Sequence, residues 1–128
     1  MRILGIDYGE KKIGLSFSEG NLAAPIGVEP NTKDFGRKIK DFCQKEKVEK
    51  IVLGISEGQM AQKQKKFGAK MARICGLPVE LWDETLTSQE AVKVMIESGR
   101  KRKKRRVEDA VSAALILQSY LDFQKEAA

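Results

Sequence analysis

Apolar and polar positions along the chain fall into blocks of different period, and these blocks predict its strands and helices. The first thirty residues begin with a buried run, RILGID, and continue with Ile13, Leu15 and Phe17 alternating with smaller or polar residues. That alternation is typical of a strand with one buried face. Pro25 in the third apolar segment is compatible with an edge strand or with the first residues of a strand. These patterns predict an antiparallel meander of three strands at residues 2–7, 13–18 and 24–30.

Helical and strand patterns alternate in the rest of the chain. A helix beginning at Asn31-Thr32 places apolar residues at i, i+4, i+7 and i+8, from Phe35 to Cys43. Residues 50–55 form an apolar run without alternation, as expected of a central parallel strand covered on both faces. Four more elements are expected. Residues 60–74 form a helix whose lysines lie off its apolar side, and residues 78–83 form a strand. The capping box TSQE opens a helix at residues 87–95, and a last helix covers residues 107–123.

The resulting order, β-β-β-α-β-α-β-α-α, predicts an α/β fold. Three antiparallel strands followed by two parallel strands give a mixed sheet with helices on both faces. This is the element order of the ribonuclease H-like fold. The 128 residues show no internal repeat or boundary, so we expect a single domain over 1–128.

Composition restricts the chemistry that the protein can perform. A net charge of +6 favours polyanionic partners such as nucleic acid. The absence of histidine excludes Ser-His-Asp and Cys-His catalysis and any His-ligated zinc site. Cys43 and Cys75 lack metal-ligand spacing, so we interpret them as reduced packing residues. No apolar run has the length of a membrane span, and we expect the protein in the cytoplasm without a membrane partner.

Three groups of carboxylates lie where an active site would form. Asp7 ends the first strand, Asp83 and Glu84 end the strand PVELWD, and Asp109 lies in the first turn of the last helix. Ligands gather at the carboxyl ends of parallel strands, so we expect these acids to converge. Mg²⁺ prefers such oxygen ligands, and a pair of these ions can promote phosphodiester hydrolysis. Each acid alone also fits a turn residue, a solvated loop or a helix-dipole acid.

A block of consecutive basic residues precedes the last of these acids. Such a run is usually a solvated loop, but its position next to Asp109 favours binding of a nucleic-acid backbone. Phosphate contacts of this kind position a substrate without reading its sequence. Tyr8 is the candidate near the site for base stacking. The block comprises Arg100, Lys101, Arg102, Lys103, Lys104, Arg105 and Arg106.

Four stretches resemble one known family. LGIDYGEKKIGLS, IVLGI, LPVELWDETLTSQEA and VEDAVSAALILQSYLD follow, in order, the pattern of the YqgF (RuvX) family of ribonuclease H-like proteins. The resemblance implies a cytoplasmic nuclease that processes the precursor of 16S ribosomal RNA, acting with Mg²⁺ or Mn²⁺ on nucleic acid and in contact with ribosomal particles. Holliday-junction resolution is the older proposal for the family.

The family motifs assign roles to individual residues. The resemblance places the catalytic and metal-binding set on Asp7, Glu84 and Asp109. Asp83 remains the alternative ligand, although side-chain alternation along the strand favours Glu84 as the inward member of the pair. The basic residues that would hold the nucleic acid are Lys11, Lys12 and those from Arg100 to Arg106.

The chain departs from the family pattern at two places, and the sequence leaves other interpretations open. Thr85 replaces the usual arginine after the acidic pair, and the 56–59 loop is short. The same acids would serve a homodimeric nuclease that cuts branched DNA. Another alternative is a basic RNA-binding module for ribosome assembly without catalysis. A nucleotide-binding fold of the actin or sugar-kinase kind would need two such domains.

Overall fold

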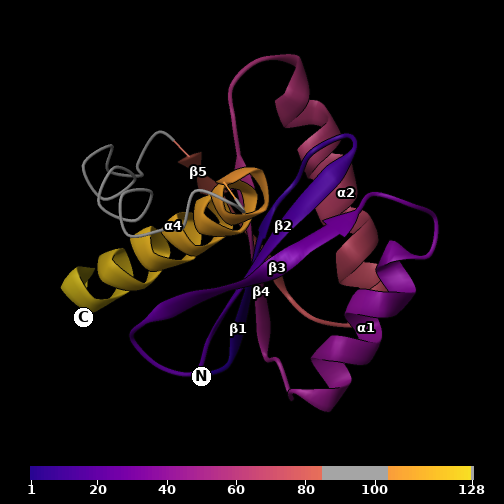
Figure 1. The fold of residues 1–128 in the computed structure, drawn as a ribbon. Helices are drawn as coiled ribbons and strands as arrows, with labels where there is room; N and C mark the ends of the chain where they lie inside the picture. The colour runs from indigo at the N-terminus through magenta and orange to yellow at the C-terminus, as the bar shows by residue number, and fades with distance from the viewer. Residues whose placement is uncertain (85–103, 128) are drawn as a thin grey trace.

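The computed structural model describes residues 1–84 and 104–127, with the backbone alone at 104–109 and at 126–127. It contains a five-stranded mixed sheet with the order β3-β2-β1-β4-β5 (Figure 1). β1, β2 and β3 pair antiparallel, whereas β4 pairs parallel with β1 and β5. The predicted mixed-sheet class is confirmed. The strands are β1 (Ile3–Asp7), β2 (Lys12–Ser18), β3 (Ala23–Pro30), β4 (Lys50–Ile55) and β5 (Val79–Asp83).

Helices cover both faces of the sheet, also as predicted. α1 (Phe35–Lys45) and α2 (Gln59–Cys75) pack on one face, and α4 (Lys104–Ala127) packs on the other (Figure 1). Leu4 and Ile6 of β1 are fully buried in the cluster under α1 and α2. A methyl group added at Gly5 would instead lie 2.9 Å from Cβ of Leu117 in α4. Because side chains alternate along a strand, the odd-numbered positions of β1 face α4.

The positions of the outer and central strands follow the sequence pattern. β3, which contains Pro25, lies at the edge of the sheet, where a missing N–H donor is tolerated. Ile51, Val52 and Leu53 of β4 have no exposed surface, consistent with a strand covered on both faces. The two cysteines, Cys43 in α1 and Cys75 at the end of α2, are free thiols of the cluster between these helices and the sheet. A hydrogen bond with Cys75 and burial both raise the pKa of Cys43, so this side chain stays protonated.

Two helix starts differ from the prediction. α1 begins at Phe35 because Asn31 serves the β-hairpin instead of a helix cap. The Asn31 backbone N–H donates to the Lys11 carbonyl, and its Nδ2 donates to the Gly9 carbonyl, both at 2.9 Å. α4 begins at Lys104, three residues early, so Asp109 lies in its second turn, beyond the strongest part of the helix dipole. The helix expected at 87–95 lies outside the described residues.

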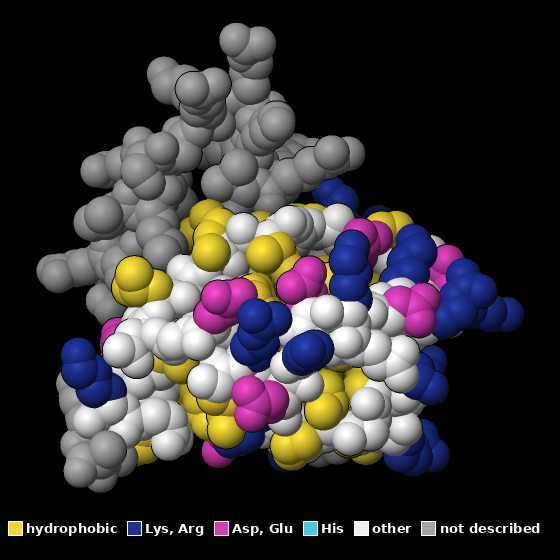
Figure 2. All heavy atoms as spheres, turned by 90° about the horizontal axis from the view of Figure 1, so that it is seen from below, with side chains coloured by type: hydrophobic (Ala, Val, Ile, Leu, Met, Phe, Trp, Pro, Cys, Tyr) yellow, Lys and Arg dark blue, Asp and Glu magenta, His cyan; other side chains and the backbone are white. Residues whose placement is uncertain are grey.

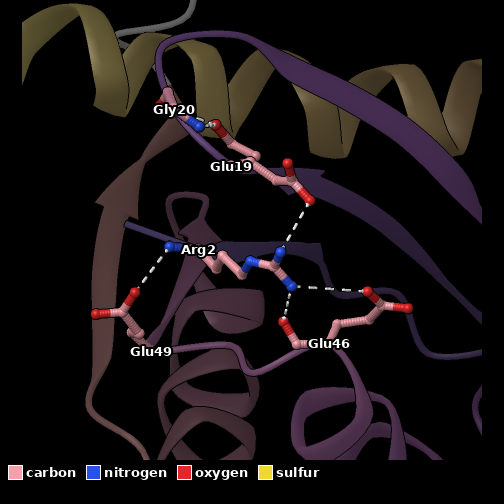
Figure 3. Close-up of polar contacts among 6 residues, drawn as sticks. Arg2, Glu19, Gly20, Glu46 and Glu49 are labelled. Atoms are coloured by element: carbon pink, nitrogen blue, oxygen red, sulfur yellow. Dashed lines mark hydrogen bonds and ion pairs between the residues drawn. The ribbon is translucent and has the colours of Figure 1, made fainter.

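Arg2, which precedes β1, contacts three glutamates from other parts of the chain (Figure 3). Its Nη1 donates to the carbonyl oxygen of Glu46 at 2.7 Å, and its Nη2 lies 3.4 Å from Oε1 of Glu19. Its backbone N–H donates to Oε1 of Glu49 at 3.2 Å. Figure 2 views the molecule from below, where the chain begins, and shows acidic side chains interspersed with Lys and Arg. These contacts fix the beginning of the strand that ends at Asp7.

Candidate active site

Asp7 ends β1 at a place where both neighbouring strands carry a glycine. In the pairing register it lies opposite Gly14 of β2 and Gly54 of β4. Asp7 is an odd-numbered position, so its side chain lies on the face of the sheet that α4 covers. Neither flanking residue has a side chain, and a methyl group added at Gly54 would meet Ile116 of α4, so side chains of other elements cover this part of the face. The strand therefore presents a half-buried acid between two glycines.

Glu84 lies over one of these two glycines. A methyl group added at Gly54 would lie 3.2 Å from Oε1 of Glu84 and in contact with Ile116 of α4. The Glu84 carboxylate therefore lies over Gly54, next to the strand that carries Asp7 and on the same face of the sheet. Among the described residues, Glu84 forms no ion pair with a lysine or an arginine. The Glu84 carboxylate and Asp7 therefore occupy neighbouring positions on one face of the sheet, over β4 and at the end of β1.

Asp83 belongs to the opposite face of the sheet. Val79 and Leu81, which precede it at alternate positions of β5, both lie about 3.5 Å from a methyl group added at Gly68 in α2. Trp82, between Leu81 and Asp83, packs instead against Tyr120 of α4. By alternation, Asp83 points to the α2 side and is exposed. The structure thus separates the two acids that the sequence pattern left as alternatives.

The backbone of α4 brings Asp109 toward the same edge. Ser16, which pairs with Gly5, donates its hydroxyl to the Ala113 carbonyl at 2.8 Å, whereas Tyr120 contacts Lys50 at the start of β4. The helix therefore runs opposite to β1. Asp109 precedes Ala113 by one turn, about 6 Å along the helix axis. Asp7 lies beyond Gly5 by two strand residues, about 6–7 Å. The Asp109 backbone thus lies at the level of Asp7, while its side chain is outside the described part.

The donor set suits a divalent cation that prefers oxygen. Within residues 1–84 and the described side chains of α4, no group of three His, Cys, Asp or Glu side chains forms a metal site. Asp7 and Glu84 are the two described members of the predicted set, and two carboxylates held together repel unless a cation lies between them. Carboxylate oxygens are ligands that Mg²⁺ and Mn²⁺ prefer, and the histidine-free sequence offers no imidazole for a softer ion.

The predicted basic residues are only partly within the described structure. Lys11 is exposed in the turn from β1 to β2, and Lys12 is exposed at the first residue of β2. Lys104, Arg105 and Arg106 form the first turn of α4, of which only the backbone is described, and 100–103 lie outside the described residues. The short 56–59 loop is held at its start, because the Ser56 N–H donates to Oε1 of buried Gln64 at 2.8 Å. Thr85 also lies outside the described residues.

A second charged cluster, at the other end of the sheet, has a structural role. Nζ of Lys50 donates to Oε2 of Glu80 at 2.9 Å and to the Tyr120 hydroxyl at 2.7 Å. These bonds raise the pKa of Lys50. Burial would raise the pKa of Glu80, but the bonds from Lys50 and Tyr120 outweigh it and lower that pKa. Burial is the main cause of the raised pKa of Tyr120. The three groups satisfy one another, so we interpret them as a packing element.

A cavity of about 310 Å³ opens near Tyr8, on the side of α1 and α2. Phe67 contributes to its wall, and Lys63, Lys66 and Lys70 of α2 surround it. The sequence pattern singled out Tyr8 but gave these lysines no role, because lysines spaced along a helix usually form a solvated face. Trp82, by contrast, is buried, and its Nε1 donates to the Ser119 hydroxyl at 3.1 Å.

Comparison with known proteins identifies the family. The model of the RuvX family, described as Holliday junction resolvase, matches residues 1–123. This chain belongs to the RuvX family. Relatives named "Putative pre-16S rRNA nuclease" include those of Agathobacter rectalis, 37% identical with 96% of each chain covered, and of Caldanaerobacter subterraneus subsp. tengcongensis, 39% identical with 98% of this chain and 99% of the relative covered. The resemblance inferred from the four motifs is therefore confirmed.

Solved structures support the fold of this RuvX protein. RuvC of T. thermophilus in complex with a Holliday junction substrate aligns with a TM-score of 0.65 and 15% identity, covering 97% of this chain and 96% of RuvC. The fowlpox virus Holliday junction resolvase aligns with a TM-score of 0.62 and 16% identity, covering 97% of this chain and 99% of the viral chain. At these identities the likeness establishes the fold, and the ribonuclease H-like prediction is confirmed. Among the described residues, no helix has the length and apolarity needed to cross a membrane.

Proposed function

We propose that this RuvX protein is a divalent-metal-dependent nuclease that hydrolyses phosphodiester bonds in the precursor of 16S ribosomal RNA. One observation carries the proposal: the Glu84 carboxylate lies over Gly54, the residue paired with Asp7. Two acids from distant parts of the chain thus meet at the carboxyl edge of a sheet, where ligands of open α/β sheets bind. The names of the curated relatives support the choice of RNA substrate. A cytoplasmic location and contact with ribosomal particles follow from that substrate.

In this proposal Asp7, Glu84 and Asp109 hold Mg²⁺ or Mn²⁺. When bound, the ion lowers the pKa of water and stabilises charge on the phosphate oxygens. Asp7 supplies a carboxylate fixed by its strand, since its backbone is paired on both sides. Glu84 supplies a second carboxylate from the residue just after β5, and Asp109 approaches from α4. Because three separate elements contribute, the site forms only when the sheet and α4 are packed together.

The basic residues would hold the nucleic acid across this edge. Lys11 and Lys12 follow Asp7 within five residues, and the run from Arg100 to Arg106 leads into the helix that carries Asp109. Positive charge in the segments that adjoin these acids in the sequence would attract phosphates and offset the repulsion between the acids and the backbone of the substrate. Such contacts would position the strand without reading its sequence.

A second candidate is resolution of branched DNA, which the description of the RuvX family favours. The two substrates can be separated by comparing a 5′-extended 16S precursor RNA with a synthetic four-way DNA junction, each with Mg²⁺, with Mn²⁺ and with EDTA. We expect cleavage of the RNA with either metal and none with EDTA. Symmetric cutting of the junction with the RNA left intact would contradict the RNA proposal and support resolution. Binding of RNA without cleavage under any metal condition would indicate a non-catalytic assembly module.

A further inference from the structure

The cavity beside Tyr8 has an aromatic wall. The rings of Tyr8 and Phe67 lie 4.6 Å apart with an interplanar angle of 39°, and Phe35 lies behind them with its ring 5.8 Å from that of Phe67. All three rings line the cavity, where Phe35 is buried and Tyr8 and Phe67 are half-buried. An aromatic surface that stays open to solvent can stack the flat face of a nucleic-acid base.

Positive charge surrounds the same cavity. Lys63, Lys66 and Lys70 follow one another at i, i+3 and i+7, so they form a single stripe of α2. Lys63 is paired with Glu10, whose Oε1 lies 2.6 Å from its Nζ, and this hydrogen bond lowers the pKa of Glu10. Lys66 and Lys70 make no ion pair within the described part of the chain. The positive charges of Lys66 and Lys70, one helical turn apart, repel each other, so binding of an anion between them is favoured.

The cavity is also next to the candidate active site. Tyr8 follows Asp7 directly, so its backbone is one residue, about 3.8 Å, from that of Asp7. Alternation turns their side chains to opposite faces, with Asp7 toward α4 and Tyr8 toward α2, where its ring contacts Phe67. A strand whose phosphate lies at Asp7 could thus place a neighbouring nucleotide around the end of β1 and into the cavity.

We propose that this cavity is a nucleotide-binding pocket, with the base stacked on Tyr8 and Phe67 and the phosphate held by Lys66 and Lys70. The volume of about 310 Å³ is at the small end of ligand pockets, as suits a single nucleotide. The inference rests on the proposed function for one source of the ligand, a nucleotide of the substrate strand. A free mononucleotide offers the same chemistry, and the experiment distinguishes the two.

The phosphate contacts are tested with two double variants that remove equal charge from the same helix. Lys66→Gln/Lys70→Gln changes the pocket, and Lys65→Gln/Arg73→Gln changes exposed positions of α2 outside it. Binding of a short single-stranded RNA is measured by fluorescence anisotropy in EDTA at several salt concentrations. Loss of the one phosphate contact that the two lysines share should reduce the log-log salt slope by about 0.7, the contribution of one phosphate on a single strand. The control variant should change it by less than half as much.

The stacking contact is tested at Tyr8. Tyr8→Leu should weaken RNA binding about fivefold or more, the lower range for loss of one base stack, while Tyr8→Phe should retain wild-type affinity because it keeps the ring. Both variants should unfold at the same temperature as the wild type, which would show that the pocket has changed and the fold has not. Equal affinity of Tyr8→Leu and Tyr8→Phe, or equal salt slopes for the two lysine pairs, would overturn the proposal when RNA is the ligand.

The source of the nucleotide is tested by titrating the wild type with each free nucleoside 5′-monophosphate. The ligand is a free nucleotide if a monophosphate shifts the ring resonances of Tyr8 and Phe67 and also displaces the RNA. Lys66→Gln/Lys70→Gln should then lose both the shifts and the displacement. An RNA effect without monophosphate binding identifies a nucleotide of the strand. Lack of a difference between pocket and control variants in both titrations rejects the pocket. Because these measurements use EDTA, a protein that shows the pocket effects but never cleaves RNA would refute only the proposed hydrolysis.

Discussion

Replacing Asp7 with Asn is expected to reduce metal-dependent RNA cleavage by about a thousandfold or more, the range seen when one member of a catalytic unit is removed. The amide keeps the size of the side chain but removes the negative charge that would hold the cation. The backbone of residue 7 pairs with β2 and β4 in either case, so the fold should persist. Single-turnover cleavage at saturating protein gives the chemical step directly.

The matched control for this variant is Asp41→Asn, which removes the same charge from an exposed position of α1. Cleavage by the control should stay within about twofold of wild type, because surface charge far from the site acts only through screened long-range attraction. RNA binding by Asp7→Asn in EDTA should equal or exceed that of the wild type, since one negative charge near the phosphates is lost. Undiminished cleavage by Asp7→Asn would remove this residue from the mechanism.

The second large effect is expected at the acidic pair after β5. Glu84→Gln should lower cleavage about a hundredfold or more, whereas Asp83→Asn should leave it within about threefold of wild type. The structure gives the reason. The Glu84 carboxylate lies over Gly54 beside Asp7, while Asp83 continues the face of β5 that packs on α2. The two variants remove one charge each from adjacent residues, so they control for each other.

The dependence of the rate on metal concentration distinguishes a ligand from a residue that only shapes the site. A ligand variant should need a higher concentration of Mg²⁺ to reach half its maximal rate, and Glu84→Gln is expected to show this shift. For Asp83→Asn we expect the wild-type titration curve. A reversal of the two results would mean that the chain turns at residue 83 to present that acid to the site, and the assignment of Glu84 would be wrong.

The strands and their order along the chain could be predicted because buried segments are apolar in the sequence. β4 has an unbroken apolar run since helices cover both of its faces. The prediction of one buried face for β2 was wrong, because its small polar residues are buried too: Ile13 lies in the cluster with α1 and α2, whereas Ser16 is covered by α4 and donates its hydroxyl to the Ala113 carbonyl. The boundary of α1 could not be predicted in this way. Asn31 is a common helix cap, but here its backbone and side chain bind the turn between β1 and β2, a contact across about twenty residues of chain.

The candidate site was predictable in part. Asp7 and Glu84 could be proposed because strand ends and side-chain alternation are local properties. The position of Gly14 and Gly54 on either side of Asp7 could not be predicted, because it depends on the pairing register between strands that are distant in the sequence. The pocket beside Tyr8 was missed for the same reason. The stripe from Lys63 to Lys70 resembles any solvated helix face until the fold places it around the Tyr8 and Phe67 rings.

The most direct test of the account is to locate a bound metal. Crystals of the wild-type protein soaked with Mn²⁺ would give an anomalous difference map, in which we expect a peak bounded by the carboxylates of Asp7, Glu84 and Asp109. The same soak of Asp7→Asn crystals should lose or strongly weaken that peak. A well-occupied Mn²⁺ peak elsewhere on the protein, with none between Asp7 and Glu84, would contradict the claim that these acids share a divalent ion.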